Sequence, residues 1–209
     1  MKKATVPIIG LTGQTGAGKS TVASRLRAGG LSVIDADQAS RQVMQPGSRV
    51  LEALAGAFGS DILLPGGALN RPLLAQRAFR SPAQTEKLNA LTHPAIIKVM
   101  RHEIAQAVQS GAQAVVLDAP QLFESGANQI CDWIIAVVAP EDIRLRRIMA
   151  RDQISENSAR LRANAQKSEA YYREHADILV RNFPPFDLAQ ELKPVWEKLC
   201  DSEEKAEDT

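Results

Sequence analysis

The feature that most constrains the fold of this chain is a glycine-rich stretch near its start, GLTGQTGAGKST, at residues 10–21. It holds the spacing G-x-x-x-x-G-K-S over residues 13–20 and lies between an apolar segment and the helical pattern KSTVASRLRAG. Glycines let the backbone turn so that several N–H groups point at one anion, and the start of a helix favours negative charge there. A chance match in a glycine-rich turn is the alternative, but the order of strand, loop and helix favours a phosphate-binding loop.

The residue types of this loop suit a nucleotide together with magnesium. Lys19 can neutralise the β and γ phosphates, and the hydroxyl of Ser20 can bind Mg²⁺. The residues that we expect around the nucleotide are Gly13, Gln14, Thr15, Gly16, Ala17, Gly18, Lys19, Ser20 and Thr21.

Five short apolar runs, rich in valine and isoleucine, alternate with longer helical patterns along the chain. Because the runs are apolar on successive positions, they predict strands buried on both faces, hence an α/β fold with a parallel sheet between helices. The longest run is much shorter than the roughly 20 residues of a membrane span, so we expect no membrane association. The runs are VPIIGLT (6–12), LSVIDAD (31–37), AVVLDAP (114–120), WIIAVVA (133–139) and DILVRN (177–182).

Two longer segments interrupt this alternation within what we expect to be one domain over residues 1–209. Residues 38–112 contain several helical patterns separated by proline or glycine, which predicts a mostly helical insertion that covers the sheet edge and shapes a second substrate pocket. Residues 141–166 predict a helix, a break near Ser155 and another helix. The final residues, 201–209, carry five acids and one lysine, and we expect them to be a disordered acidic tail.

The helix of the second segment carries arginines at i, i+3 and i+7, namely Arg144, Arg147 and Arg151, so they share one face. Guanidinium groups bind phosphate oxygens in bidentate fashion and stabilise charge in a transition state. A solvated helix face is the alternative, but beside a nucleotide loop we favour an arginine-rich lid that closes over phosphates.

Carboxylates follow two of the predicted strands. Asp35 and Asp37 come after the second run, where an acid can orient a hydroxyl and take its proton during phosphoryl transfer. Asp37 also fits as the N-cap of the next helix, so Asp35 is the better candidate base. Asp118 ends the third run, where an acid can support the magnesium shell and the substrate, although a simple turn residue is the alternative.

For three further residues the sequence allows either a structural or a ligand-binding role. His93, before a proline in LTHPAI, is a loop histidine or a contact to an anionic substrate. Arg71, in LNRP, is a surface ion pair or a phosphate ligand. Asn182 ends the fifth run, at the ligand edge of the sheet, where an amide can meet a nucleotide base.

The composition narrows the class of protein. Aromatic residues are only 4% of the chain, so a nucleic-acid stacking surface is not expected. The two cysteines, Cys131 and Cys200, are far apart and fit neither a disulfide framework nor a zinc site, which favours a reducing cytoplasm. The start MKKATVPIIG leads straight into the glycine stretch, unlike a secretory signal.

The chain has no N-K-x-D segment of a GTP switch, and it is small for a motor or transport ATPase, so a kinase of small metabolites is favoured. Its motifs resemble the dephospho-CoA kinase family from about residue 8 to residue 182. They occur in the family's order and spacing: IGLTGQTGAGKSTVA, VIDADQASRQVMQPG, GALNRPLLAQRAF, EKLNALTHPAI, DAPQLFE, the arginine helix and ADILVRN.

The resemblance implies a P-loop NTPase fold of three α/β/α layers with a five-stranded parallel sheet, a CoA-binding insertion and a lid. It also implies transfer of the γ-phosphoryl group of ATP, with Mg²⁺, to the 3′-hydroxyl of dephospho-CoA, the last step of coenzyme A biosynthesis. Asp35 is then the general base, Arg71 and His93 belong to the CoA pocket, and Arg147 is the lid arginine. Another nucleotide or small-metabolite kinase, or a non-catalytic nucleotide-binding regulator, is the alternative.

This chain departs from the family pattern at two places. The loop reads GQTGAGK where the family more often has GGIGSGK, but the changes fall on tolerant positions. Gln121 in DAPQLFE replaces an expected apolar residue, which implies a local polar contact or a modest change in the substrate pocket.

Overall fold

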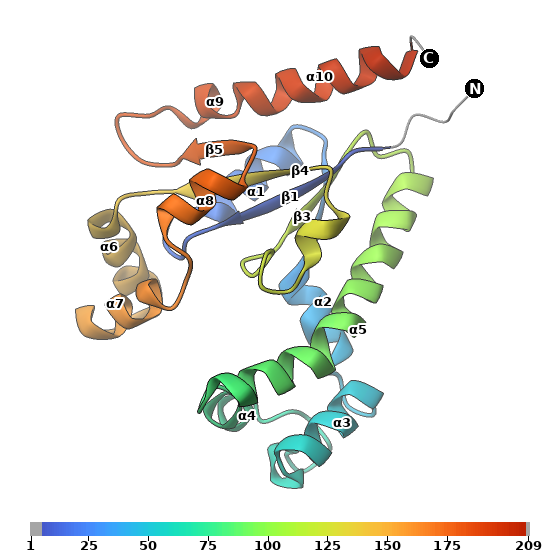
Figure 1. Cartoon of the computed structure of the whole chain (residues 1–209), viewed down its shortest axis with the longest axis vertical. Coiled ribbons are helices and arrows are strands. Elements are labelled where there is room, and N and C mark those ends of the chain that lie inside the picture. The colour runs from blue at the N-terminus through green and yellow to red at the C-terminus, as the bar shows by residue number, and fades with distance from the viewer. Residues whose placement is uncertain (1–5, 208–209) are drawn as a thin grey trace. The chain divides into compact units, whose positions relative to one another are not determined.

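A five-stranded parallel sheet with the order β2-β3-β1-β4-β5 is the centre of the fold, in a computed structural model that describes residues 6–207 (Figure 1). All five predicted strands are confirmed. Their bounds are β1 Ile8–Gly13, β2 Ser32–Asp35, β3 Val115–Asp118, β4 Trp133–Val138 and β5 Ile178–Arg181.

The described helices follow the strands in the predicted alternation. Their bounds are α1 Lys19–Ala28, α2 Ala36–Val43, α3 Arg49–Phe58, α4 Arg71–Ala78, α5 Pro82–Gln109, α6 Glu141–Asp152, α7 Glu156–Asn164, α8 Glu169–His175, α9 Leu188–Glu191 and α10 Lys193–Glu207. Two short 3₁₀ segments, Ser60–Ile62 and Ala127–Ile130, complete the set. None of the helices within residues 6–207 is long and apolar enough to cross a membrane.

The chain divides into two compact units, which are described separately. The first consists of Met1–Ile34 with Gln106–Thr209, and the second of Asp35–Ala105. The second unit covers most of the segment that we predicted to be a helical insertion, and α2, α3, α4 and most of α5 lie in it.

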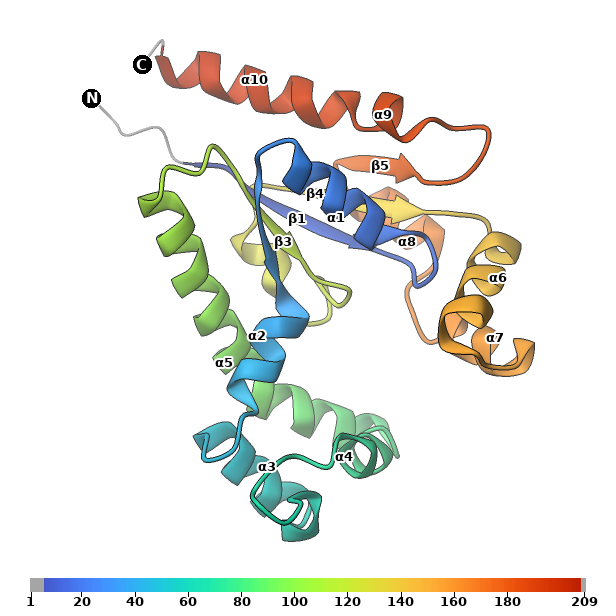
Figure 2. The same cartoon turned by 180° about the vertical axis from the view of Figure 1, so that it is seen from behind.

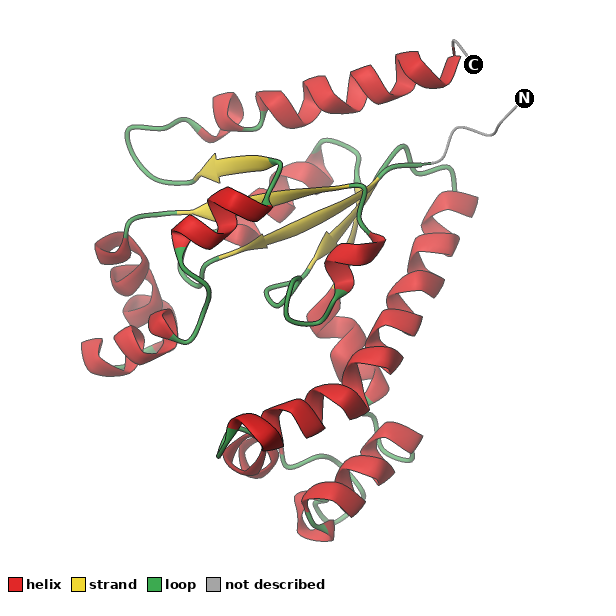
Figure 3. Ribbon diagram, viewed as in Figure 1, coloured by secondary structure: helices red, strands yellow, loops and turns green. Residues whose placement is uncertain are grey.

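In the first unit the sheet is covered on both faces, as its apolar strands require. Every residue of β4 is buried. Ile135 and Val137 belong to a core shared with α1 and α10, whereas Ala136 and Val138 pack with Tyr172 of α8. Figures 1 and 2 show α1 and α8 on opposite faces of the sheet, and Figure 3 shows the strands between helical layers. This three-layer arrangement confirms the predicted fold class.

The second unit has a small core of its own, built by α3, α4 and the 3₁₀ segment between them. Its buried residues are Leu54, Phe58, Ile62, Leu74 and Ala78. Within this unit α5 continues through Pro94, where a break was expected, and Figure 1 shows the long helix bending. A proline removes one hydrogen bond and kinks a helix, but neighbouring turns can hold it together. His93 therefore lies in a helix, so the alternative of a loop histidine is wrong.

The end of the chain also differs from the expectation. The tail predicted to be disordered from residue 201 is helical as far as Glu207, because α10 continues into it. The helix is anchored earlier by Val195, Trp196 and Leu199 against the main core, and the sequence that follows is rich in good helix formers. The last two residues of that prediction lie outside the described residues.

Candidate active site

The nucleotide loop connects β1, which ends at Gly13, to α1, which begins at Lys19. The N-cap residue is Gly18, at φ 93°, so no capping side chain occupies the first N–H groups of α1. Free N–H groups at a helix start, together with the helix dipole, favour an anion at this point. The strand, loop and helix predicted from the sequence are therefore in place.

Two glycines of the loop are required by close neighbours. A Cβ on Gly16 would lie 2.6 Å from the main-chain oxygen of Arg144, and a Cβ on Gly18 would overlap the side-chain amide of Asn182. Both glycines also have positive φ angles, 78° and 93°. The loop is thus packed tightly on α6 and on the end of β5.

The carbonyl oxygens of the loop are held by side chains from these two elements. Arg147 Nη1 donates to the carbonyl oxygens of Gly16 and Ala17, at 3.2 and 3.1 Å. Asn182 Nδ2 donates to the oxygen of Gly18, at 3.2 Å. In a planar trans peptide the C=O and N–H point in opposite directions, so holding the oxygens of Ala17 and Gly18 turns the next two N–H groups the other way. Oriented N–H groups of this kind make an anion site.

Lys19 forms an ion pair with Asp118, the last residue of β3. Their side chains are only 17% and 15% exposed. The structure thus brings together the predicted phosphate ligand and the predicted strand-end acid. Ser20 follows in the first turn of α1 and is exposed. Within residues 6–207, no group of three or more His, Cys, Asp or Glu side chains forms a metal cluster.

The three arginines of α6 that were predicted to share one face do not form a solvated face. Arg144 is buried, and its Nε donates to the carbonyl oxygen of Ala139 at 3.1 Å. Burial lowers the pKa of Arg144, with nearby Glu141 acting against this shift. Arg151 is exposed and pairs with Asp152. Residues 144 and 151 are separated along the axis by about 10 Å, which explains their different surroundings despite a shared angular position.

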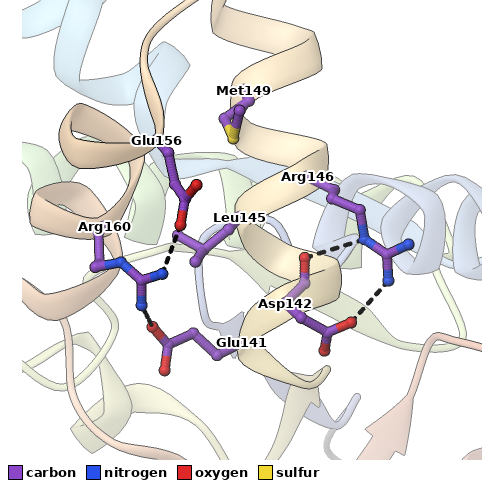
Figure 4. Close-up of a pocket in the computed structure, with 7 residues that line it drawn as sticks. All are labelled: Glu141, Asp142, Leu145, Arg146, Met149, Glu156 and Arg160. Atoms are coloured by element: carbon purple, nitrogen blue, oxygen red, sulfur yellow. Dashed lines mark hydrogen bonds and ion pairs between the residues drawn. The ribbon is translucent and has the colours of Figure 1, made fainter.

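The break predicted near Ser155 is present, because α6 ends at Asp152, its C-cap Gln153 is in a left-handed conformation, and Ser155 caps α7. Two sets of ion pairs join the resulting helices. Arg160 of α7 donates to Glu141 and Glu156, at 2.8 and 2.6 Å (Figure 4). These side chains line a cavity of about 700 Å³, together with Asp142, Leu145, Arg146 and Met149.

A second arginine of α7 also pairs with an acid of α6, at the other end of the α6–α7 hairpin (residues 141–164). Arg162 pairs with Asp152, which also holds Arg151. Hydrogen bonds and charges from both guanidinium groups lower the pKa of the Asp152 carboxyl. A single ion pair on the surface contributes little to the free energy of folding, whereas a network of such pairs contributes more.

In the second unit, Asp35 is both the last residue of β2 and the N-cap of α2. Its Oδ1 accepts hydrogen bonds from the main-chain N–H groups of Asp37 and Gln38, at 2.8 and 3.4 Å. The alternative that Asp37 caps the helix is therefore wrong, because α2 begins at Ala36, two residues before the Gln38 start that an Asp37 cap would give. Asp37 is exposed in the first turn of α2.

The two predicted CoA-side residues lie on different helices of this unit. Arg71 is the first residue of α4 and is exposed, and the side chain of Asn70 caps that helix at 3.2 Å. His93 is partly buried in α5, and burial lowers the pKa of its imidazole. In the first unit, Gln121 is exposed in the turn after β3.

One contact to the loop was missed by the sequence analysis. The Oε1 of Gln166 accepts a hydrogen bond of 2.5 Å from the main-chain N–H of Thr15. Gln166 lies in the link between α7 and α8, where a glutamine is ordinary and no local spacing marks it. Only the folded chain brings residues 15 and 166 together.

Known proteins resemble this chain over most of its length. A family model described as dephospho-CoA kinase matches residues 7–184. The dephospho-CoA kinase of Corynebacterium diphtheriae is 42% identical over 194 residues, which cover 92% of this chain and 97% of the relative. That of Syntrophotalea carbinolica is 41% identical and covers 84% of this chain and 83% of its own length.

Solved structures agree with these matches. The Thermus thermophilus protein TT1252 has a TM-score of 0.80 at 34% identity and covers 92% of this chain and 97% of its own. A dephospho-CoA kinase from Campylobacter jejuni has a TM-score of 0.67 at 25% identity, with 92% and 96% covered. A shikimate kinase from Acinetobacter baumannii shares the fold, with a TM-score of 0.52 at 17% identity. The match covers 95% of this chain and 96% of the shikimate kinase.

Proposed function

The chain belongs to the dephospho-CoA kinase family and is an ATP-dependent kinase, and we propose how its residues carry out the reaction. In this reaction the γ-phosphoryl group of ATP moves to the 3′-hydroxyl of the ribose of dephospho-CoA, which yields coenzyme A and ADP. The observation that carries the proposal is the loop over residues 13–20, with Lys19 at the start of α1 and its peptide groups oriented by Arg147 and Asn182.

The ATP side of the proposal uses groups of the first unit. The N–H groups at the start of α1 bind phosphate oxygens, and Lys19 moves from Asp118 to the β and γ phosphates when ATP enters. Arg147 lies against the loop and stabilises charge on the transferring group. The amide of Asn182, at the end of β5, is proposed to border the nucleotide base.

Magnesium fits the residues that are present. Mg²⁺ prefers oxygen ligands and is usually held by one or two protein groups plus substrate phosphates. The hydroxyl of Ser20 and the carboxylate of Asp118 supply such oxygens next to the loop, and we propose them as its protein ligands. When bound, the ion neutralises charge on the β and γ phosphates.

Asp35 is the proposed general base for the acceptor hydroxyl. Its Oδ1 is fixed by two main-chain N–H groups, so the carboxylate has a defined orientation at the end of a strand. Because phosphoryl transfer passes through a loose transition state, a carboxylate here acts by orienting the hydroxyl as much as by taking its proton. A fixed carboxylate suits that task better than the exposed Asp37.

Binding of dephospho-CoA is proposed to involve Arg71 and His93. Arg71 is exposed at the start of α4, where its guanidinium can meet a phosphate of the acceptor. Burial lowers the pKa of the His93 imidazole, which favours its neutral form as a hydrogen-bonding group. Asp118 is proposed to border the substrate as well.

A panel of acceptors tests this function. The protein is incubated with ATP, Mg²⁺ and dephospho-CoA, AMP, CMP or buffer alone, and ADP and the phosphorylated acceptor are measured. We expect ADP formation to be stimulated by dephospho-CoA only. Stimulation by a nucleoside monophosphate would indicate a different kinase, and absence of any stimulation would indicate a non-catalytic nucleotide-binding protein.

We further propose that the protein works in the cytoplasm. Both cysteines are free thiols, which suits a reducing compartment. The measurement that tests this is the location of the tagged protein in fractionated cells.

A further inference from the structure

The nucleotide loop is held from outside at successive peptide groups. The N–H of Gln14 donates to the carbonyl oxygen of Val137 in β4, at 3.3 Å. The carbonyl oxygens of Gly16 and Ala17 accept from Arg147, and Gly18 is held by Asn182. The peptide between Gln14 and Thr15 has a different partner, Gln166, which takes its N–H group.

This partner has a specific effect on the turn of the loop. When Gln166 holds the N–H of Thr15, the carbonyl of Gln14 in the same peptide points the opposite way. That carbonyl oxygen accepts the N–H of Ala17, at 3.0 Å, and so closes the turn. The side chain of Gln166 therefore fixes the Gln14–Thr15 peptide at its N–H group. The carbonyl oxygen of the same peptide holds the N–H of Ala17 and so sets the position of the turn.

Gln166 also comes from a particular place in the fold. It lies directly after α7, whereas Arg147 lies in the middle of α6. The α6–α7 hairpin thus contacts the loop at two separate points, once through Arg147 and once through the link that follows α7. The hairpin is internally braced by its own core, Leu145, Ile148, Ala159 and Ala163. Because this core packs α6 against α7, both contacts to the loop come from one packed pair of helices.

We propose that Gln166 is a positioning residue of the ATP-binding loop. From the exit of the α6–α7 hairpin it holds the Gln14–Thr15 peptide in the orientation that forms the turn before ATP arrives. A loop that is already formed does not lose conformational freedom on binding, so the hydrogen bond raises the affinity for ATP without contacting the acceptor. The inference rests on the ATP-binding half of the proposed function, and it does not depend on which acceptor is used.

The test compares Gln166→Leu with the intact protein. Leucine has a similar size but no acceptor oxygen. We expect the Kd of ATP, measured by calorimetry without any acceptor, to rise about tenfold, the usual effect of one lost hydrogen bond. The KM of dephospho-CoA is expected to stay within about twofold of the value for the intact protein. The substitution removes one hydrogen bond of the ATP loop and no hydrogen bond of the acceptor pocket. Amide exchange at Thr15 in the ATP-free protein is expected to accelerate.

Two further variants separate positioning from mere structural support. Gln166→Glu keeps an acceptor oxygen, so Thr15 is expected to regain slow amide exchange. Asn157→Leu makes the same kind of change at an exposed position of α7 and is expected to leave ATP binding and Thr15 exchange as they are.

Three outcomes would overturn the proposal. An unchanged Kd of ATP in Gln166→Leu would show that Gln166 does not position the ATP-binding loop. Equal increases in the ATP and dephospho-CoA constants together with a lower Tm would indicate general destabilisation. Fast Thr15 exchange in Gln166→Glu would show that the acceptor oxygen does not protect this amide. A protein that bound ATP as expected but failed to phosphorylate dephospho-CoA would contradict the acceptor assignment and leave this inference intact.

Discussion

Arg147 Nη2 donates a hydrogen bond of 2.8 Å to the main-chain oxygen of Asn182, while the side chain of Asn182 donates to the neighbouring loop. The same guanidinium binds two loop carbonyls through Nη1. One arginine of α6 therefore connects the nucleotide loop to the end of β5. The predicted lid arginine thus supports the loop itself, in addition to its proposed action on phosphates.

Replacement of Arg147 by lysine is expected to lower kcat/KM for ATP about 100-fold. A lysine can reach one carbonyl but cannot hold three in a fixed fork, and hydrogen bonds to a charged group are worth about 1.5–3 kcal/mol each. Steady-state kinetics with varied ATP measure the effect. The matched control is Arg146→Lys on the same helix, whose side chain is 73% exposed and paired only with Asp142 among the described contacts. Similar kinetics in both variants would contradict this role.

Gly18→Ala is expected to abolish tight ATP binding, because the added methyl group overlaps the amide of Asn182. Gly30→Ala is the control, since Gly30 has nearly the same φ, 94° against 93°, but no atom lies within 4 Å of the added carbon. The left-handed backbone alone costs about 1–2 kcal/mol at either site. Urea unfolding and ATP calorimetry on the two variants separate strain from overlap. Equal losses of stability and of ATP affinity in Gly18→Ala and Gly30→Ala would contradict this prediction, because the overlap with Asn182 would then have no effect of its own.

The stability of the protein is expected to fall between pH 6.5 and the lower pKa of folded His93. Burial lowers the pKa of this imidazole in the folded state, so the unfolded chain takes up a proton first as the pH falls. The stabilisation is thus complete above the unfolded pKa of about 6.5 and is lost as the pH drops through the folded pKa. Urea midpoints over this range measure it, and His93→Gln is expected to flatten the profile. An unchanged profile in that variant would contradict the assignment.

The sheet could be predicted from the sequence because buried parallel strands leave a strong local signal. The run WIIAVVA became β4, and both of its faces are buried as expected. The break near Ser155 was also predictable, since a serine that caps a helix marks its start. The loop over residues 13–20 was identified by its spacing together with the apolar run before it and the helical pattern after it.

Other features depend on packing that no local pattern records. The helical patterns of residues 38–112 are separated by prolines and glycines, but α5 continues through Pro94. Arg144 is expected in an arginine-rich lid over phosphates, with a solvated helix face as the alternative, but its side chain is buried and its Nε donates to the carbonyl oxygen of Ala139. The contact between Gln166 and Thr15 joins residues 151 positions apart, and only the fold brings them together.

The turnover of Asp35→Asn shows most directly whether Asp35 is the general base. Asparagine keeps an oxygen for the N–H groups of Asp37 and Gln38 and is as good an N-cap as aspartate, so α2 is expected to fold normally. The change removes the base. Asp37→Asn serves as the control, because its side chain is exposed in the same turn.

We expect Asp35→Asn to lower turnover of dephospho-CoA by about 10²–10⁴-fold while the Kd of ATP stays as in the intact protein. Asp37→Asn is expected to change neither quantity. Near-normal turnover in Asp35→Asn, or loss of turnover in Asp37→Asn alone, would contradict this assignment of the base.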